Sequence, residues 1–129
     1  IGKLDQAMEL SKDILLKINQ HQIGYEATSG RYASYILGYY YLYLFKNPIE
    51  AKKYFNECLS FSKQTDSMDS GYYWASVLGL ARIAYQELNY DQAVDYCKEV
   101  IDKADRKSSQ HTEAKKLLAE AKKARRKRK

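Results

Sequence analysis

The 129-residue chain contains one proline and six glycines. With scarcely a run of β-branched residues, little in the sequence interrupts helices, and the composition favours an all-α fold. No window approaches the roughly 18 uninterrupted apolar residues of a membrane-spanning helix, so none is expected. Hydrophobic residues still make up 45% of the chain, which is typical of an ordered globular domain with a core.

Cysteine and histidine are equally scarce. The two cysteines, Cys58 and Cys97, match neither a disulfide framework nor a metal-ligand spacing. Each falls on the apolar side of an expected helix, which predicts a small core residue, with a mutual disulfide as the alternative. The compartment stays open, with a lean towards a reducing one such as the cytoplasm. His21 and His111 are 90 positions apart and are interpreted as surface residues rather than ligands or a catalytic base.

The residues needed for catalysis are also missing. The glycines form no phosphate-binding cluster, and those in the Leu-Gly pairs at 37–38 and 78–79 are better explained by close helix packing. The 16 acidic residues are scattered, and no serine has an evident base beside it. We therefore expect a protein without catalytic activity, cofactor or metal.

What is present is a repeat. The segment KLDQAMELSKDI at 3–14 is echoed by NPIEAKKYFNEC at 47–58 and by NYDQAVDYCKEV at 89–100. Ala7, Ala51 and Ala93 head equivalent segments, spaced by 44 and 42. A second block, SGRY at 29–32 followed by LG, recurs 41 residues later as SGYY followed by LG. A fixed period in this range is the signature of a helical solenoid.

Each unit is expected to form two antiparallel helices. Asn47 and Asn89 are suitable N-caps, and Pro48 suits a first helical position. Apolar residues then recur at helical spacing. The predicted buried faces are Ala51, Phe55, Cys58 and Leu59; then Trp74, Leu78, Ala81, Tyr85 and Leu88; then Ala93, Cys97, Val100 and Ile101; and, in a helix over 109–124, Ala114, Leu117, Leu118 and Ala121.

These features divide the chain. Residues 1–24 are predicted to be the second half of a truncated repeat, 25–66 and 67–108 two complete repeats, and 109–129 a capping helix with a basic tail. A chain that starts halfway through a repeat is expected to be a fragment of a longer protein. Its first helix is expected to expose Ala7, Leu10, Ile14 and Leu15.

The segment LARIAYQELNYDQAVDYCKEVIDKAD at 80–105 resembles a tetratricopeptide repeat (TPR). Ala93 matches the small residue early in the second helix of that family, Tyr90 the aromatic at the turn, and Val100 and Ile101 later packing positions. Pro48 departs from the pattern, and the unit of about 42 residues resembles long-helix variants of a repeat that is usually about 34 residues. The resemblance covers residues 1 to about 105. It implies helix pairs stacked as a short right-handed superhelix of about six helices.

Tyrosine is unusually abundant, with 13 residues, and Tyr39, Tyr40, Tyr41 and Tyr43 form the densest run. A helix turns about 100° per residue, so at least one of them is expected to face a concave surface or solvent. The alternative is that they fill gaps between helices. The resemblance implies a groove lined by the first helix of each pair, where a partner segment docks. The candidate partner-binding residues are Ser34, Tyr40, Tyr43, Arg82, Tyr85 and Gln86. Some relatives grip a terminal carboxylate with Lys and Asn residues; only Arg82 is of that kind here.

The net charge of +6 is unevenly distributed. Residues 1–104 carry −2 (11 Lys and Arg against 13 Asp and Glu), and residues 105–129 carry +8 (11 against 3). The basic tail consists of Lys122, Lys123, Arg125, Arg126, Lys127, Arg128 and Lys129. Such a run binds nucleic acid or acidic membranes, or acts as a localisation signal. It can equally be a solvated helix end. It has no interleaved aromatics for stacking on single strands.

Together these patterns favour a non-catalytic protein–protein interaction or scaffold module that holds a peptide or helix in a tyrosine-rich groove. The alternatives are a nucleic-acid or anionic-surface adaptor acting through the basic tail, and a purely structural repeat spacer. The sequence indicates neither the partner's identity nor the oligomeric state.

Overall fold

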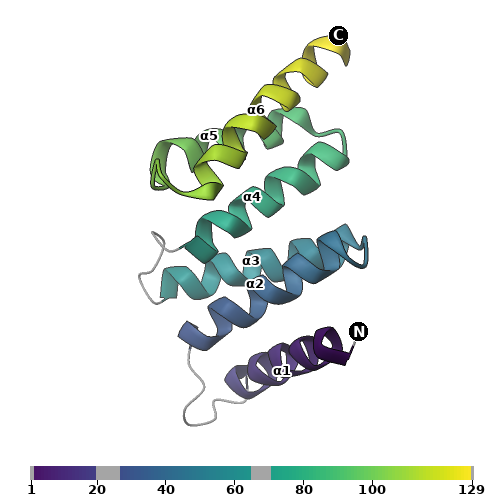
Figure 1. The fold of residues 1–129 in the computed structure, drawn as a ribbon, viewed down its shortest axis with the longest axis vertical. Helices are drawn as coiled ribbons and strands as arrows, with labels where there is room; N and C mark the ends of the chain where they lie inside the picture. Colours follow the sequence, from purple (N-terminus) through teal and green to yellow (C-terminus); the bar gives the residue numbers. More distant parts are fainter. Residues whose placement is uncertain (1, 20–26, 65–70, 129) are drawn as a thin grey trace.

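The computed structural model describes residues 2–19, 27–64 and 71–128, and these residues form six helices and no strand (Figure 1). The all-α class predicted from the composition is therefore confirmed. The helices are α1 (Gly2–Asn19), α2 (Ala27–Tyr43), α3 (Pro48–Gln64), α4 (Gly71–Gln86), α5 (Tyr90–Lys103) and α6 (Ser109–Arg128). The division into repeats stays a prediction.

The helices are stacked along the long axis of the molecule, from α1 at one end to α6 at the other (Figure 1). Each helix packs against the next along the chain. In addition, α2 contacts α4, and α4 contacts α6. Within the described parts of the chain, the backbones of α1, α3 and α5 do not approach one another in this way. The even-numbered helices thus form one continuous row.

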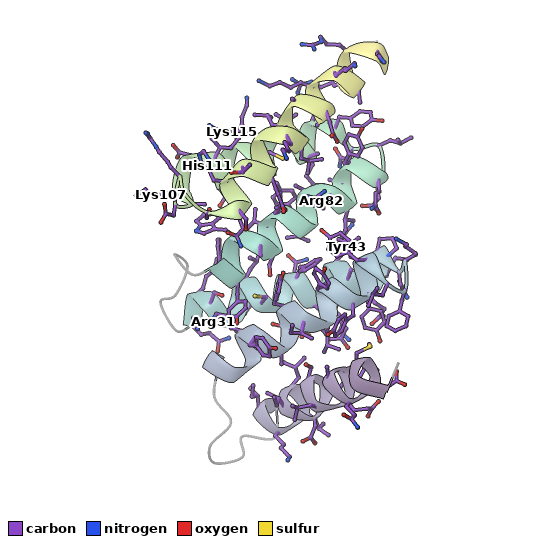
Figure 2. The ribbon with its side chains drawn as sticks, viewed as in Figure 1. Arg31, Tyr43, Arg82, Lys107, His111 and Lys115 are labelled. Carbon is purple, nitrogen blue, oxygen red and sulfur yellow. The ribbon has the colours of Figure 1, made fainter. Side chains whose placement is uncertain are left out.

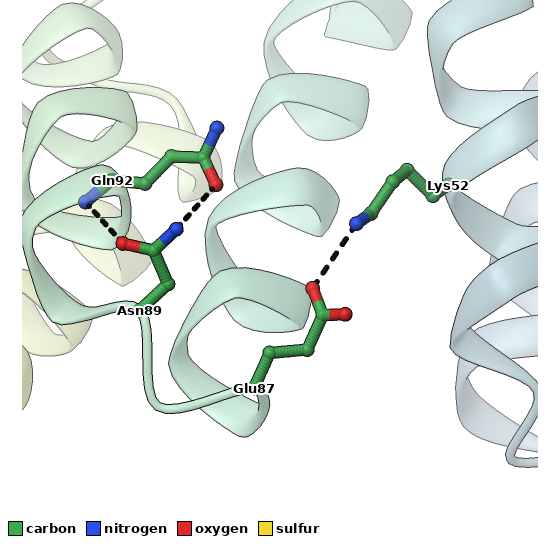
Figure 3. Close-up of polar contacts among 4 residues, drawn as sticks. All are labelled: Lys52, Glu87, Asn89 and Gln92. Carbon is green, nitrogen blue, oxygen red and sulfur yellow. Dashed lines mark hydrogen bonds and ion pairs between the residues drawn. The ribbon is translucent and has the colours of Figure 1, made fainter.

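Two short turns use the same local chemistry 42 residues apart. Asn47 and Asn89 accept hydrogen bonds through Oδ1 from the backbone N–H three residues later, at 3.2 and 3.3 Å. These bonds cap α3 and α5 as expected (the second cap is drawn in Figure 3).

The residue before each asparagine has a positive φ, which is 53° at Lys46 and 64° at Leu88. Leu88 therefore lies beyond the helix and is 54% exposed, and its predicted place on the buried face of α4 is wrong.

The close approach of α2, α3 and α4 depends on two glycines. A Cβ atom at Gly38 would lie 2.7 Å from the ring of Phe55, and one at Gly79 would lie 2.6 Å from the same ring. Since real Cβ atoms essentially never come this close, Phe55 fits between α2 and α4 only because both positions lack a side chain. The prediction that the Leu-Gly pairs permit close packing is confirmed.

The predicted apolar faces of the later helices are largely buried. Cys58 and Cys97 are both 0% exposed and both free, which confirms them as core residues and rules out their mutual disulfide. In α6, Ala114, Leu117 and Ala121 are buried.

Two predictions of exposure, for His111 and for Leu15 of α1, are wrong. His111 is only 6% exposed, so its interpretation as a surface residue is wrong: it lies one turn before Ala114 and extends the same buried stripe. His21 is outside the described residues. In α1, Leu10 is 61% exposed as expected, but Leu15 is only 8% exposed. Leu15 belongs to a cluster that includes Leu37 of α2, so its predicted exposure is wrong.

Candidate binding groove

A groove runs along the row formed by α2, α4 and α6. It consists of two hollows of about 150 and 280 Å³ that share Tyr35, Ala75 and Gln110 in their linings. We call this continuous depression the groove. Its lining residues are Arg31, Tyr35, Tyr39, Tyr43, Phe55, Gly71, Tyr72, Ala75, Leu78, Ser109, Gln110 and Glu113.

One wall of the groove is a row of tyrosines on α2. Tyr35, Tyr39 and Tyr43 are spaced by four residues, so they follow one another along a single face of the helix. Neighbouring rings are in contact, with centroids 6.2 Å apart for Tyr35 and Tyr39 and 4.7 Å apart for Tyr39 and Tyr43. Tyr39 is 41% exposed. The row therefore offers aromatic surface to anything that enters the groove.

Two hydroxyls of this row, those of Tyr35 and Tyr43, have a raised pKa. Burial, together with the neighbouring Tyr43 and Tyr39, raises the pKa of Tyr35 to about 12. Burial also raises the pKa of Tyr43, against an opposing effect of the nearby Arg82 charge. These side chains can thus donate and accept hydrogen bonds without carrying charge.

An ion pair crosses the groove between α4 and α6. The Nη2 atom of Arg82 lies 3.2 Å from Oε2 of Glu113, with both side chains partly exposed. Figure 2 shows Arg82 close to Tyr43, near the end of α2. A pair this exposed adds at most about 1 kcal/mol to stability, but it neutralises the charge at this end of the groove.

The other end of the groove carries a different arginine. Arg31 lies near the start of α2 (Figure 2), and its guanidinium carbon is 5.9 Å from the centroid of the Tyr72 ring. Tyr72 in turn contacts Tyr35, with ring centroids 5.5 Å apart. The Nε atom of Arg31 is buried and has no hydrogen-bond partner. Arg31 thus lies against an aromatic face and has no carboxylate partner among the described residues.

The predicted partner-binding residues do not all lie at the groove. Tyr43 lines the groove, and Arg82 reaches it through Glu113. Tyr40 instead packs against the cluster of Met8, Leu15, Ala33 and Leu37 between α1 and α2. Tyr85 packs against the clusters beside α5 and α6, and Gln86 is exposed at the end of α4 without lining the groove.

Ser34 was placed in the groove incorrectly. Its side chain is 0% exposed, and its hydroxyl donates a hydrogen bond to the carbonyl oxygen of Gly30 at 2.6 Å. The groove position belongs to the next residue, Tyr35, about 100° further around the helix. Tyr35, Arg31 and Gln110 were missed, although the four-residue spacing of Arg31, Tyr35, Tyr39 and Tyr43 was a usable signal.

The basic tail forms the last two turns of α6. The Nη1 atom of Arg125 lies 2.8 Å from Oδ1 of Asp91. Lys122, Arg125 and Arg126 also line a wide hollow of about 910 Å³ beside the turn between α4 and α5. Lys123, Arg126 and Lys127 are exposed. Lys129 and the side chain of Arg128 lie outside the described residues.

Another hollow, of about 430 Å³, lies between α1 and α3 and is lined by residues that include Lys12, Tyr54, Glu57 and Phe61. Burial raises the pKa of Glu57 there, and the pKa of Lys12 is raised by its hydrogen bond to Tyr41. Nothing in this hollow repeats the aromatic row of the groove.

The described part of the chain holds no group of three or more His, Cys, Asp or Glu side chains arranged to bind a metal ion. None of its helices has the length and hydropathy needed to cross a membrane.

Comparison of the chain with protein-family models, curated proteins and solved structures finds no match.

Proposed function

We propose that this chain is a non-catalytic protein–protein interaction module whose groove holds a peptide or a helix of a partner. The observation that supports it most directly is the row of Tyr35, Tyr39 and Tyr43 facing the hollow between α2, α4 and α6. The stacking of α2, α4 and α6 along one side is also consistent with the TPR-like architecture that the sequence resembles.

The lining has the chemistry of a protein-binding surface. Tyrosine provides a large contact area with few rotatable bonds, so ordering it on binding costs little entropy. Tyrosine and arginine are also among the residues that most often dominate binding energy in interfaces. The groove combines both types, with three tyrosines in a row and an arginine near each end.

The proposal excludes catalysis for a chemical reason. Among the described residues, the groove lining includes no histidine or cysteine, and Glu113 is its single carboxylate. That carboxylate is paired with Arg82, and the hydroxyls of Tyr35 and Tyr43 have raised pKa values. No side chain in the lining is poised as a base or nucleophile at neutral pH.

The test is a pull-down from the source cell with three proteins. They are the wild type, the groove variant Tyr39→Ala/Tyr43→Ala, and the tail variant Lys123→Gln/Arg126→Gln/Lys127→Gln, each first shown by circular dichroism to be helical. We expect the groove variant to lose a captured protein that the tail variant retains, because truncating an interface tyrosine commonly costs about 1 kcal/mol or more.

The same experiment decides between the two alternatives. Loss with the tail variant alone would replace the groove by the electrostatic adaptor. Retention by all three proteins would favour a structural spacer. The exposed Lys123, Arg126 and Lys127 of α6 are the observation that favours the electrostatic adaptor.

A further inference from the structure

We infer that the partner segment is acidic, with a carboxylate that binds Arg31 at one end of the groove. This inference rests on the proposed function and adds the chemical class of the ligand.

Among the described residues, Arg31 is the charged group of the groove that lacks a counter-ion. Within the described residues it takes part in no ion pair, and its Nε atom is buried without a hydrogen-bond partner. Arg82, at the other end, also has a buried Nε atom without a hydrogen-bond partner, but its charge is paired with Glu113 at 3.2 Å. Buried polar groups in native proteins are nearly always satisfied. An unsatisfied arginine in a groove therefore points to a ligand that supplies the missing charge.

The surroundings of Arg31 position its guanidinium for such a ligand. The side chain is partly exposed and lines the hollow of about 280 Å³. The ring of Tyr72 lies 5.9 Å from the guanidinium carbon, and a stacked guanidinium can still donate hydrogen bonds in its own plane. A carboxylate matches those donors with two parallel hydrogen bonds.

Neighbouring groups favour a negative charge at this end. The hollow is also lined by Gly71, where α4 begins, and by Gln110 of α6. The first turn of α4 itself contains no acidic residue, and the positive end of a helix dipole favours a negative charge. The Gln110 amide adds a neutral donor.

The rest of the groove excludes a polyanion. Glu113 lines the part next to Tyr35, Tyr39 and Tyr43 and is already paired with Arg82, so a phosphate chain or a continuous run of acids would meet no unpaired cation among the described residues there. The groove therefore fits a single carboxylate at Arg31, followed by apolar or aromatic side chains along the tyrosines. This arrangement favours a peptide over a nucleic acid.

The length of the groove sets the spacing within that peptide. Arg31 and Tyr43 are twelve residues apart on α2, which is about 18 Å along a helix. An extended chain covers about 3.3 Å per residue. The acidic residue and the last large apolar residue of the partner are therefore expected to be separated by about five or six positions.

The experiment selects peptides from a random 12-residue library displayed on phage. The library is panned against the wild type, against Arg31→Gln and against Tyr39→Ala/Tyr43→Ala. We expect Asp and Glu to be enriched among peptides selected by the wild type and not among those selected by Arg31→Gln. One wild-type-selected peptide and its Glu→Gln or Asp→Asn isostere are then synthesised, and their affinities are measured by fluorescence polarisation.

A double-mutant cycle gives the decisive number. Neutralising the peptide's acid should weaken binding to the wild type about tenfold or more, and should change binding to Arg31→Gln less than about twofold. Peptides that need Tyr39 and Tyr43 but show no coupling to Arg31 would overturn the acidic specificity and leave the groove function standing. Failure to select any peptide that depends on those tyrosines would overturn both.

Discussion

At the scale of single residues, Phe55 shows how the repeat is built into the core. Its ring lies between Gly38 of α2 and Gly79 of α4, which are 41 residues apart and equivalent in the repeat. Each glycine admits one side of the ring, so a residue of α3 joins both helices of the even-numbered row. The groove is formed by that row, and its shape therefore depends on this packing.

We expect Gly79→Ala to destabilise the protein by about 1–2 kcal/mol. A Cβ at this position would meet Phe55 at 2.6 Å, and overpacking a core typically costs about 1–3 kcal/mol. The better helix propensity of alanine returns at most about 1 kcal/mol. Urea unfolding followed by circular dichroism measures the difference.

Gly71→Ala is the matched control. Its Cβ would meet only Nε2 of Gln110, at 3.8 Å, which is an ordinary contact. We expect a change of no more than about 0.5 kcal/mol, because the site is exposed and alanine restricts the unfolded chain. If Gly79→Ala proved as harmless as Gly71→Ala, the close approach around Phe55 would be wrong.

At the scale of elements, the turns set where each helix begins. The turn before α3 places Lys46 in the left-handed region at φ 53° and then Asn47 as the cap. The turn before α5 repeats the arrangement with Leu88 and Asn89. The ion pair between Lys52 of α3 and Glu87, at 3.1 Å, links the second turn to the preceding helix pair (Figure 3).

Two adjacent substitutions in the first turn are expected to act in opposite directions. Asn47→Ala removes the cap of α3 and should destabilise by about 1 kcal/mol. Lys46→Gly removes a side chain from a left-handed position and should stabilise by up to about 1 kcal/mol, because only glycine adopts that conformation without steric cost. Thermal melts should shift by a few degrees each way. Shifts of the same sign would contradict the turn geometry.

Local signals explain why the elements could be predicted. Asparagine before Pro48, and apolar residues at helical spacing, act within a few residues and need no knowledge of the tertiary fold. Leu88 was misplaced because its positive φ ends α4 before the apolar pattern does. A leucine in the sequence gives no indication that its backbone will adopt a positive φ.

The site was harder to predict because it depends on the rotation of each helix. Ser34 and Tyr35 are adjacent, yet one is buried and the other lines the groove. Likewise Tyr40 packs towards α1 while Tyr39 faces the groove. Only the packing of α2 against α1, α3 and α4 fixes this rotation, so a run of tyrosines alone could not show which of them face a partner.

At the scale of the whole molecule, two surfaces of different character lie apart. The groove between α2, α4 and α6 is aromatic, and Arg31 in it has no counter-ion among the described residues. The C-terminal end of α6 carries exposed Lys123, Arg126 and Lys127, and residues 105–129 hold the whole excess of positive charge. If the groove is the functional surface, a partner should bind independently of the tail.

Salt dependence separates the two surfaces. Contacts to phosphates release bound counterions, so affinity falls steeply with salt, by a factor of about 10³ or more between 50 and 200 mM for six or more contacts. One carboxylate at Arg31 and several tyrosine contacts should lose much less, within about threefold over the same range. Fluorescence polarisation with a groove-selected peptide and with a 20-base-pair DNA duplex measures both slopes.

In the variant Lys123→Gln/Arg126→Gln/Lys127→Gln, any binding of the duplex should fall sharply while the peptide affinity stays unchanged. A peptide affinity that drops with this variant, or follows the steep slope of the duplex, would show that the basic tail takes part in binding and that the groove does not act alone.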